Sequence, residues 1–213
     1  MTEELEIRRE YYVLRSCAQD CRLNLGNTDA VAHRLAEWLD AHEEELAAHF
    51  AAQLGAGRPV LAHNRIQIAL AGCPNACSEP QIRDFALIGI AVVEPGEGEC
   101  SGCRLCERVC LEEAVTVAAT VAIDESRCLR CGMCAAVCPT GALEVKARGY
   151  RVLVGGKLGR HPRLATELVS FCAEEECYPI FEQVLNFWFE HREKGERLGS
   201  TIERAGRPPL PAR

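Results

Sequence analysis

The stretch ECSGCRLCERVC, residues 99–110, and the stretch RCLRCGMCAAVCP, residues 127–139, share one cysteine spacing. In both, four cysteines follow the pattern C-x2-C-x2-C-x3-C. They are Cys100, Cys103, Cys106 and Cys110 in the first copy, and Cys128, Cys131, Cys134 and Cys138 in the second. This spacing lets three thiolates of one tight loop hold three corners of a cubane iron–sulfur cluster. The sequence therefore predicts two 4Fe-4S clusters.

Each copy alone is an incomplete site, because its fourth cysteine points away from the first three and toward a neighbouring cube. The two copies can complete each other. The expected ligand sets are Cys100, Cys103 and Cys106 with Cys138, and Cys128, Cys131 and Cys134 with Cys110.

Zinc and disulfide bonds are the competing interpretations of so many cysteines. A zinc site would bind one ion with four ligands from two separated pairs, and three cysteines in C-x2-C-x2-C argue against that arrangement. Cysteines this close in one loop also cannot bridge in several directions at once. The doubled spacing therefore favours iron–sulfur clusters over both alternatives.

The segment from Gly96 to Val145 resembles bacterial-type ferredoxins that carry two 4Fe-4S clusters. Leu111 departs from the pattern, since that family often has proline after the fourth cysteine. The ligand spacing is untouched by this change. We therefore expect an inserted ferredoxin domain over residues 95–146.

Composition limits the setting in which this chain works. It has 213 residues, 14 of them cysteine, and a formal net charge of −7. The charged residues 1–9 hold no apolar core of a secretory signal, and no apolar run approaches the roughly 20 residues that span a bilayer. The acidic balance shows no basic footprint for nucleic acid. We expect a cytoplasmic protein that binds neither membrane nor nucleic acid.

Hydrophobic periodicity outlines the elements around the cysteine repeats. Apolar residues at helical intervals predict one helix over residues 28–54, with Thr28 or Asp29 as its N-cap. A helical pattern also begins at Leu164. Strands are predicted over residues 65–70, 85–93 and 150–154.

A strand thus precedes the cysteine repeats and another follows them. The ferredoxin segment therefore reads as an insertion into a second, discontinuous domain made of residues 1–94 and 147–213. The predicted fold class is α+β.

Four further cysteines suggest a third metal site. Cys73 and Cys77 flank Pro74-Asn75-Ala76, and Cys17 and Cys21 form another C-x3-C pair. Two such pairs can supply four corners of a third cube. The alternative is that they are buried free thiols, since cysteine is commonly a small core residue.

The octapeptide AGCPNACS, residues 71–78, resembles the C-x3-C signature of sulfite and nitrite reductases. The neighbourhoods of Cys17 and Cys21, and the glycine turn within residues 150–163, are similar to the same family, so that the resemblance covers most of residues 11–205. In that family a 4Fe-4S cluster is coupled to sirohaem through a shared cysteine sulfur. Dissimilatory members also carry an inserted ferredoxin after this segment.

The resemblance implies a set of roles in this chain. Cys17, Cys21 and Cys73 would complete the third cluster, and Cys77 would bridge it to the sirohaem iron. The implied cofactor-binding residues are Cys77, Asn75, Gly155, Gly156, Lys157 and Arg160. His161 and Arg163 add positive charge to the same turn, which suits the carboxylates of sirohaem. The alternative for this turn is an ordinary solvated basic surface.

Two departures from the family matter. The first cysteine pair of the family is usually spaced C-x5-C, whereas Cys17 and Cys21 are three residues apart. Family members also place a further α/β region before that pair, and it holds the substrate anion. Here sixteen residues precede Cys17. We expect a second subunit or a second copy of the chain to supply the missing half.

The leading hypothesis is therefore an iron–sulfur oxidoreductase resembling a sulfite or nitrite reductase. Electrons would pass from two ferredoxin clusters to a third 4Fe-4S cluster and to sirohaem, in exchange with a redox donor or acceptor protein. The alternative is a non-catalytic electron-transfer protein without sirohaem. A third hypothesis is redox sensing through the third cluster. Cys172 and Cys177 could serve it as a thiol pair, although cysteines at this five-residue spacing are more often plain core or surface residues.

Overall fold

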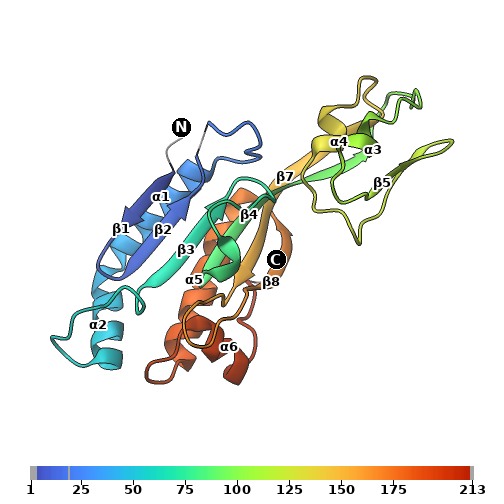
Figure 1. The fold of residues 1–213 in the computed structure, drawn as a ribbon. Helices are drawn as coiled ribbons and strands as arrows, with labels where there is room; N and C mark the ends of the chain where they lie inside the picture. Colours follow the sequence, from blue (N-terminus) through green and yellow to red (C-terminus); the bar gives the residue numbers. More distant parts are fainter. Residues whose placement is uncertain (1–3, 19, 212–213) are drawn as a thin grey trace. The chain divides into compact units, whose positions relative to one another are not determined.

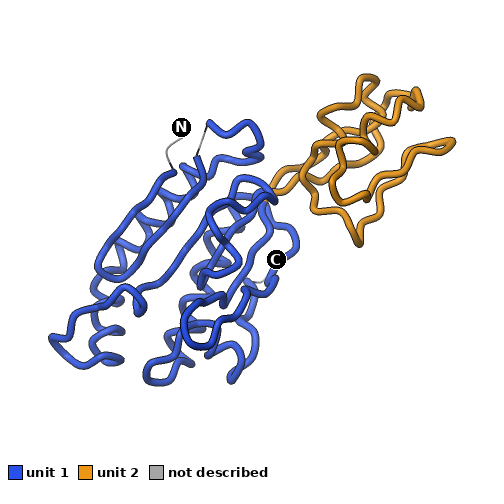
Figure 2. The backbone as a smooth tube through the Cα atoms, in the orientation of Figure 1, with its two compact units in different colours: residues 1–89, 150–213 blue, residues 90–149 orange. Residues whose placement is uncertain are grey.

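The computed structural model describes residues 4–18 and 20–211. The chain forms two compact units (Figure 2). The first unit takes residues 1–89 and 150–213, and the second takes residues 90–149. The predicted insert, residues 95–146, lies inside the second unit, and its identity as a ferredoxin stays a prediction.

The chain contains both strands and helices, several of which follow one another in pairs (Figure 1). The strands are β1 (Leu5–Arg8), β2 (Tyr12–Ser16), β3 (Ile66–Ala71), β4 (Phe85–Pro95), β5 (Val115–Val117), β6 (Val121–Ile123), β7 (Leu143–Val154) and β8 (Thr166–Cys172). The helices are α1 (Thr28–Ala41), α2 (Glu43–Leu54), the 3-10 helix η1 (Pro80–Ile82), α3 (Leu105–Val109), α4 (Met133–Ala136), α5 (Glu174–His191) and α6 (Leu198–Ala205).

A six-stranded mixed sheet organises the first unit, in the order β1-β2-β3-β4-β7-β8. The strands β2, β3 and β4 run parallel, while β1 and β8 pair antiparallel with β2 and β7. The carboxyl ends of the parallel strands therefore meet at one edge of the sheet. The loops that carry Cys17 and Cys73 leave the sheet at this edge.

One face of the sheet forms the main core with helices α1 and α5. Alternate residues of the strands, such as Leu14, Ile68 and Leu87, belong to the same buried cluster as Leu35 of α1 and Val184 of α5. A strand presents every second side chain to one face, so the core lies on this face. The apolar run of β4 is buried over residues 85–91, as its composition predicted for a strand covered on both faces.

The predicted helix over residues 28–54 is in fact two helices, α1 and α2, that meet at His42. The His42 ring stacks on Trp38 at 4.0 Å between ring centroids, and its Nδ1 lies 2.7 Å from the Trp38 carbonyl oxygen. The predicted cap is also wrong by one or two positions. Asn27 is the N-cap, because its side-chain oxygen accepts a hydrogen bond from the Ala30 amide at 3.2 Å.

The segment after Leu164 is a strand, β8, and not the predicted helix, which begins only at Glu174. Its buried residues Leu168 and Cys172 are four positions apart, so they share one face whether the segment is a strand or a helix. Pairing with β7 decides between the two. Strands β1 and β2 precede the first predicted element, and β7 begins seven residues before the predicted start at Tyr150.

The second unit is built on the two short helices α3 and α4 and the hairpin β5-β6. Its buried cluster is small and contains two of the repeat cysteines, Cys106 and Cys134, with Val115, Val117 and Leu143. Within the described part of the chain, no helix combines the length and apolarity that a bilayer crossing requires.

Candidate iron–sulfur centres

The two cysteine repeats fold into loops with the same backbone geometry. In both, the residues on either side of the second cysteine have positive φ angles: 69° at Gly102 and 56° at Arg104, then 58° at Arg130 and 74° at Gly132. Left-handed residues flanking one cysteine curl the loop tightly. Each loop then enters a short helix, α3 or α4, that buries the third cysteine, Cys106 or Cys134.

Each repeat meets the last cysteine of the other. A hollow in the second unit is lined by Cys100, Cys103 and Cys106, and Cys138 closes it from the opposite repeat. The thiols of Cys103 and Cys138 are close enough to interact electrostatically, and the same holds for Cys128 and Cys110. The structure therefore brings together the cysteines of both expected ligand sets.

Backbone amides point at several of these sulfur atoms. The Ala114 amide donates to the Cys110 sulfur at 3.3 Å, and the Arg130 amide donates to the Cys128 sulfur at 3.4 Å. A hydrogen bond from the Leu105 amide lowers the pKa of Cys103. Such bonds stabilise a thiolate, the form that binds iron.

The deeper cysteines of the repeats lie in a less favourable environment for an isolated thiolate. Burial raises the pKa of Cys106, and it raises the pKa of Cys134 to about 11. A thiolate at these positions needs a cationic partner, and cluster iron provides one. The donor set, in which the third cysteine of each repeat is buried and backbone amides point at other sulfurs, therefore fits iron–sulfur clusters.

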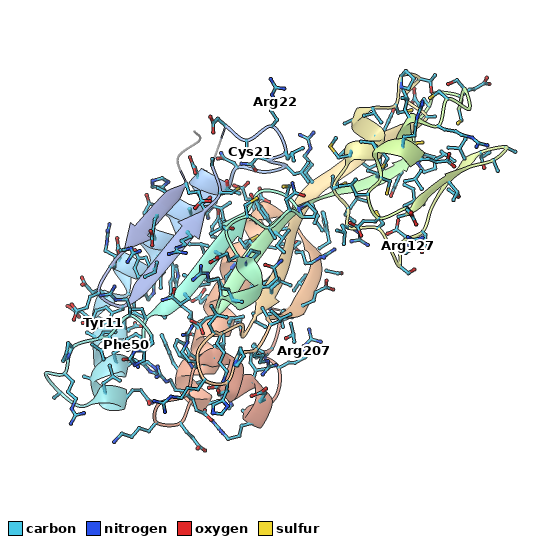
Figure 3. All side chains as sticks on the ribbon, in the orientation of Figure 1. Tyr11, Cys21, Arg22, Phe50, Arg127 and Arg207 are labelled. Carbon is cyan, nitrogen blue, oxygen red and sulfur yellow. The ribbon has the colours of Figure 1, made fainter. Side chains whose placement is uncertain are left out.

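The four remaining candidate ligands lie at the cysteine-bearing edge of the sheet. Cys17 and Cys21 follow β2, and Cys73 and Cys77 follow β3. The thiols of Cys17 and Cys73 interact electrostatically with each other and with both Cys21 and Cys77. Figure 3 shows Cys21 on the loop after β2, with Arg22 pointing away from it.

Hydrogen bonds tie the two cysteine loops together. The Cys17 amide donates to the Leu70 carbonyl at 3.0 Å, and the Gly72 amide donates to the Cys17 sulfur, also at 3.0 Å. The Leu25 amide donates to the Gly72 carbonyl at 2.7 Å. Burial raises the pKa of Cys17, and the Gly72 amide partly offsets this effect.

The Cys73–Cys77 loop also has an ordered interior. Burial raises the pKa of the Cys73 thiol, against a hydrogen bond from the Asn75 amide. Ser78 donates to the Leu70 carbonyl at 2.8 Å and closes the loop onto β3. Ser78 carries no metal-ligand signal, so the sequence interpretation missed it. Cys77 is the exposed member of the four cysteines, and Asn75 is exposed beside it.

The predicted sirohaem turn lies elsewhere on the first unit. The amides of Gly155 and Gly156 donate to the carbonyls of Asp84 and Arg83, both at 2.8 Å. These partners precede the amino end of β4, whereas the cysteines follow the carboxyl ends of β2 and β3. Lys157 donates to the Ser200 hydroxyl on α6 at 2.7 Å.

Arg163 also contacts α6, through the Gly199 carbonyl at 2.5 Å and an ion pair with Glu203 at 3.0 Å. Arg160 and His161 are exposed on the same turn. The assignment of Lys157 and Arg160 to sirohaem stays a prediction.

Besides clusters, proteins also bind single metal ions, which need several ligand side chains around one point. Among residues 4–18 and 20–211, no group of three or more His, Cys, Asp or Glu side chains is close enough to hold one metal ion.

The suggested thiol pair, Cys172 and Cys177, is buried, with 3.6 Å between the two sulfur atoms.

The mixed sheet and the paired cysteine loops define the class: a cysteine-rich α+β domain of the iron–sulfur kind. The chain belongs to the nitrite and sulphite reductase 4Fe-4S domain family, because the sequence model of that family matches residues 30–210. This finding confirms the predicted family. Members of the family bind a 4Fe-4S cluster.

Three known proteins are similar to this chain. The coenzyme F420-dependent sulfite reductase of Methanocaldococcus jannaschii is 37% identical over 145 residues, which is 67% of this chain and 23% of that protein. The crystal structure of dissimilatory sulfite reductase I matches with a TM-score of 0.59 and 24% identity, over 91% of this chain and 50% of that one.

The structure of the NirA protein of Mycobacterium tuberculosis matches with a TM-score of 0.49 and 19% identity, over 90% of this chain and 25% of that one. The chain thus spans about a quarter of its curated relative and half of the dissimilatory reductase chain. The dissimilatory reductase match supports the predicted α+β fold.

Proposed function

We propose that this chain is an iron–sulfur oxidoreductase component with two ferredoxin-type 4Fe-4S clusters in the second unit and a third in the first. Electrons exchanged with a donor protein at the ferredoxin-type clusters would reach the third cluster, and sirohaem beside it. The observation that carries this proposal is the meeting of Cys138 with Cys100, Cys103 and Cys106 around one hollow.

The chain's own residues hold and orient the cofactors. The two repeats ligate the first two clusters, and their backbone amides stabilise the thiolates. Cys17, Cys21, Cys73 and Cys77 hold the third cluster at the edge of the sheet. Because Cys77 is the exposed one of the four, its thiol is the one that would be open to sirohaem. When bound, sirohaem would supply an iron centre for multi-electron reduction of sulfite or nitrite.

We propose that a second subunit, or a second copy of this chain, contributes to the cofactor seat, because Cys77 and Asn75 beside it are exposed. A redox protein that donates or accepts electrons at the second unit is the other expected partner.

A second candidate function is an electron-transfer protein without sirohaem. The observation in its favour is the engagement of Lys157 and Arg163 with α6, because cations bonded within the chain are less available to cofactor carboxylates.

An anaerobic absorption spectrum with cofactor extraction and iron and sulfide counts separates the two functions. Enough iron for three 4Fe-4S clusters and one further iron atom, together with an extractable macrocycle, supports the reductase-like function and justifies assays with sulfite and nitrite. Iron for three cubes without a macrocycle supports the electron carrier. Iron for two cubes would remove the third cluster from both.

Double variants test the crossed ligand sets. Cys103→Ala should remove the iron of one cube. Adding Cys138→Ala to it should remove no more, because both residues serve the same cluster, whereas Cys131→Ala with Cys138→Ala should remove two cubes. Cys172→Ala is the control and should leave the iron count unchanged. If Cys138→Ala added a further loss of iron to that of Cys103→Ala but not to that of Cys131→Ala, the crossed ligation would be contradicted.

A further inference from the structure

A buried threonine lies beside the first cysteine of the third site. Thr28 is the first residue of α1, and it is 0% exposed. Asn27, and not Thr28, caps the helix. The Thr28 hydroxyl is hydrogen-bonded to the Cys17 sulfur. A hydroxyl in this place acts on a candidate cluster ligand, because its hydrogen bond reaches the atom that would bind iron.

The Asn24 side chain sets the direction of this hydrogen bond. The Gly26 amide, which can only donate, lies 3.2 Å from Asn24 Oδ1. The other end of the Asn24 amide, Nδ2, therefore faces Thr28 and donates to its hydroxyl oxygen at 3.1 Å. Because the Thr28 oxygen accepts this bond, its hydroxyl hydrogen points away from Asn24 and can donate to the Cys17 sulfur.

Asn24 is itself fixed within the third site. Its backbone amide donates to the Cys21 carbonyl at 2.9 Å. Its side chain fills the space beside Gly72, where an added Cβ would collide with Asn24 Oδ1. The residue that orients Thr28 is thus held by both loops that carry the candidate ligands.

The Cys17 sulfur accepts from a backbone donor and from a side-chain donor. The backbone donor is the Gly72 amide, at 3.0 Å. Burial raises the pKa of the Cys17 thiol, and the hydrogen bonds from Gly72 and Thr28 act against that rise. Both bonds therefore stabilise negative charge on the sulfur. Of these two donors, the hydroxyl is the one that a substitution can remove without changing the backbone.

We propose that Thr28 is a positioning residue that raises the reduction potential of the third 4Fe-4S cluster through its hydrogen bond to Cys17. Reduction adds one electron, and hence one negative charge, to a cluster and its thiolates without breaking a bond or moving a proton. A donor to a ligand sulfur stabilises the more negative state, so it makes the cluster easier to reduce. This role rests on the proposed function, because it requires the third cluster.

The hydrogen bond also suits the proposed direction of electron flow. Electrons pass spontaneously toward the centre of higher potential. A raised potential at the third cluster would draw electrons from the ferredoxin-type clusters. Thr28 would favour this transfer although it is not itself a ligand.

Anaerobic redox titration of the cluster-loaded chain with dithionite, followed by electron paramagnetic resonance, tests this role. The signal of the third cluster is the one that Cys73→Ala removes. Thr28→Val lacks the hydroxyl, and we expect it to shift the reduction equilibrium of the third cluster about tenfold toward the oxidised state, which corresponds to ~59 mV for one electron. Thr28→Ser keeps the hydroxyl and should stay within twofold of the wild type.

Two controls separate this role from a loss of stability. Thr201→Val removes the hydroxyl of another threonine that is 0% exposed in the first unit, where it donates to Glu196 at 3.1 Å. It should leave all three potentials unchanged. The two ferredoxin-type clusters of Thr28→Val are an internal control and should keep their wild-type potentials. Thr28→Ala also lacks the hydroxyl, and the same shift is expected from it should the valine variant fail to hold the third cluster.

The outcomes distinguish this role from the proposed function. Iron for only two clusters in the wild-type chain would remove the third cluster, and the role of Thr28 with it. With three clusters present, a shift smaller than twofold in Thr28→Val would overturn the role of Thr28 alone and leave the proposed function standing. An equal shift in Thr28→Ser would overturn it too, because the hydroxyl would not be the cause.

Discussion

At the scale of single residues, His49 is held neutral in an aromatic pocket. Its Nε2 lies 2.8 Å from Arg192 Nη1, and its ring contacts Phe189 with 4.1 Å between ring centroids. Arg192 lies over the Trp188 ring at 4.4 Å. Burial, and then the charge of Arg192, lower the pKa of His49 to about 4 from its ordinary 6.5. A neutral imidazole accepts the arginine's hydrogen bond, whereas a protonated one repels it.

This pocket predicts a pH dependence of stability. Between pH 6.5 and 4 the unfolded chain protonates His49 and the folded chain does not, so the free energy of unfolding falls as the pH is lowered. The slope from this group reaches at most about 1.4 kcal/mol per pH unit. His49→Gln keeps a hydrogen-bond acceptor and cannot titrate, so it should flatten the dependence.

Anaerobic urea unfolding at pH 7 and pH 5.5 measures the effect. His33→Gln, at an exposed position on α1, is the matched control and should retain the wild-type difference between the two pH values. An unchanged pH dependence in His49→Gln would show that other groups cause it.

At the scale of elements, a close approach of two glycines builds the third cysteine site. A Cβ added to Gly89, in the middle of β4, would collide with the Gly72 carbonyl group. A Cβ added to Gly72 would collide with the Asn24 side chain. Gly72 precedes Cys73 and donates to the Cys17 sulfur. The side-chain-free contact between Gly72 and Gly89 therefore positions both cysteine loops.

Gly89→Ala should push the Gly72 segment away from β4 and disturb the third site. We expect a loss of about 1–3 kcal/mol in stability, the usual cost of overpacking. We also expect loss of the iron of one cube, with the second unit still loaded. Iron counts measure this. Gly57→Ala, where an added Cβ meets nothing within 4 Å, is the control for iron content. Full iron in Gly89→Ala would separate this contact from cluster binding.

At the scale of the whole molecule, the two units differ in how much apolar core they have, so we expect them to depend on metal to different degrees. The first unit has a large apolar core between its sheet and helices α1 and α5. The second unit has a small buried cluster that includes Cys106 and Cys134, and Cys110 and Cys138 pack against it. A unit whose core contains its own ligands gains folding free energy from the bound metal.

Cluster removal should therefore unfold the second unit and leave the first folded. After anaerobic treatment with an iron chelator and mild oxidant, amides of residues 90–149 should exchange at least a hundredfold faster, while those of β3 and α5 stay protected. Hydrogen exchange with mass spectrometry measures both regions in one sample, so the first unit is an internal control. Protection of residues 115–123 in the metal-free chain would contradict this dependence.

Local spacing by itself determined the family of this protein and the cluster chemistry that we propose for it. The doubled C-x2-C-x2-C-x3-C pattern and the AGCPNACS segment indicate clusters and the reductase family, because ligand spacing within one loop is a local property. The strands β3 and β4 were also predictable, β3 from the alternation of Ile66, Ile68 and Leu70 and β4 from its continuous apolar run. Other features depend on contacts between residues distant in the chain.

Tertiary structure alone decided those features. The break at His42 follows from its packing on Trp38, and β8 is a strand because β7 pairs with it. Parallel pairing of β2 and β3 brings Cys17 beside Gly72, which no spacing predicts. Five arginines, from β1, β2 and the segments before β3, β4 and α6, likewise line one groove although they are far apart in the chain. Sequence patterns report which chemistry a residue can perform, and only the folded chain settles which residues perform it together, because long-range contacts carry no local periodicity.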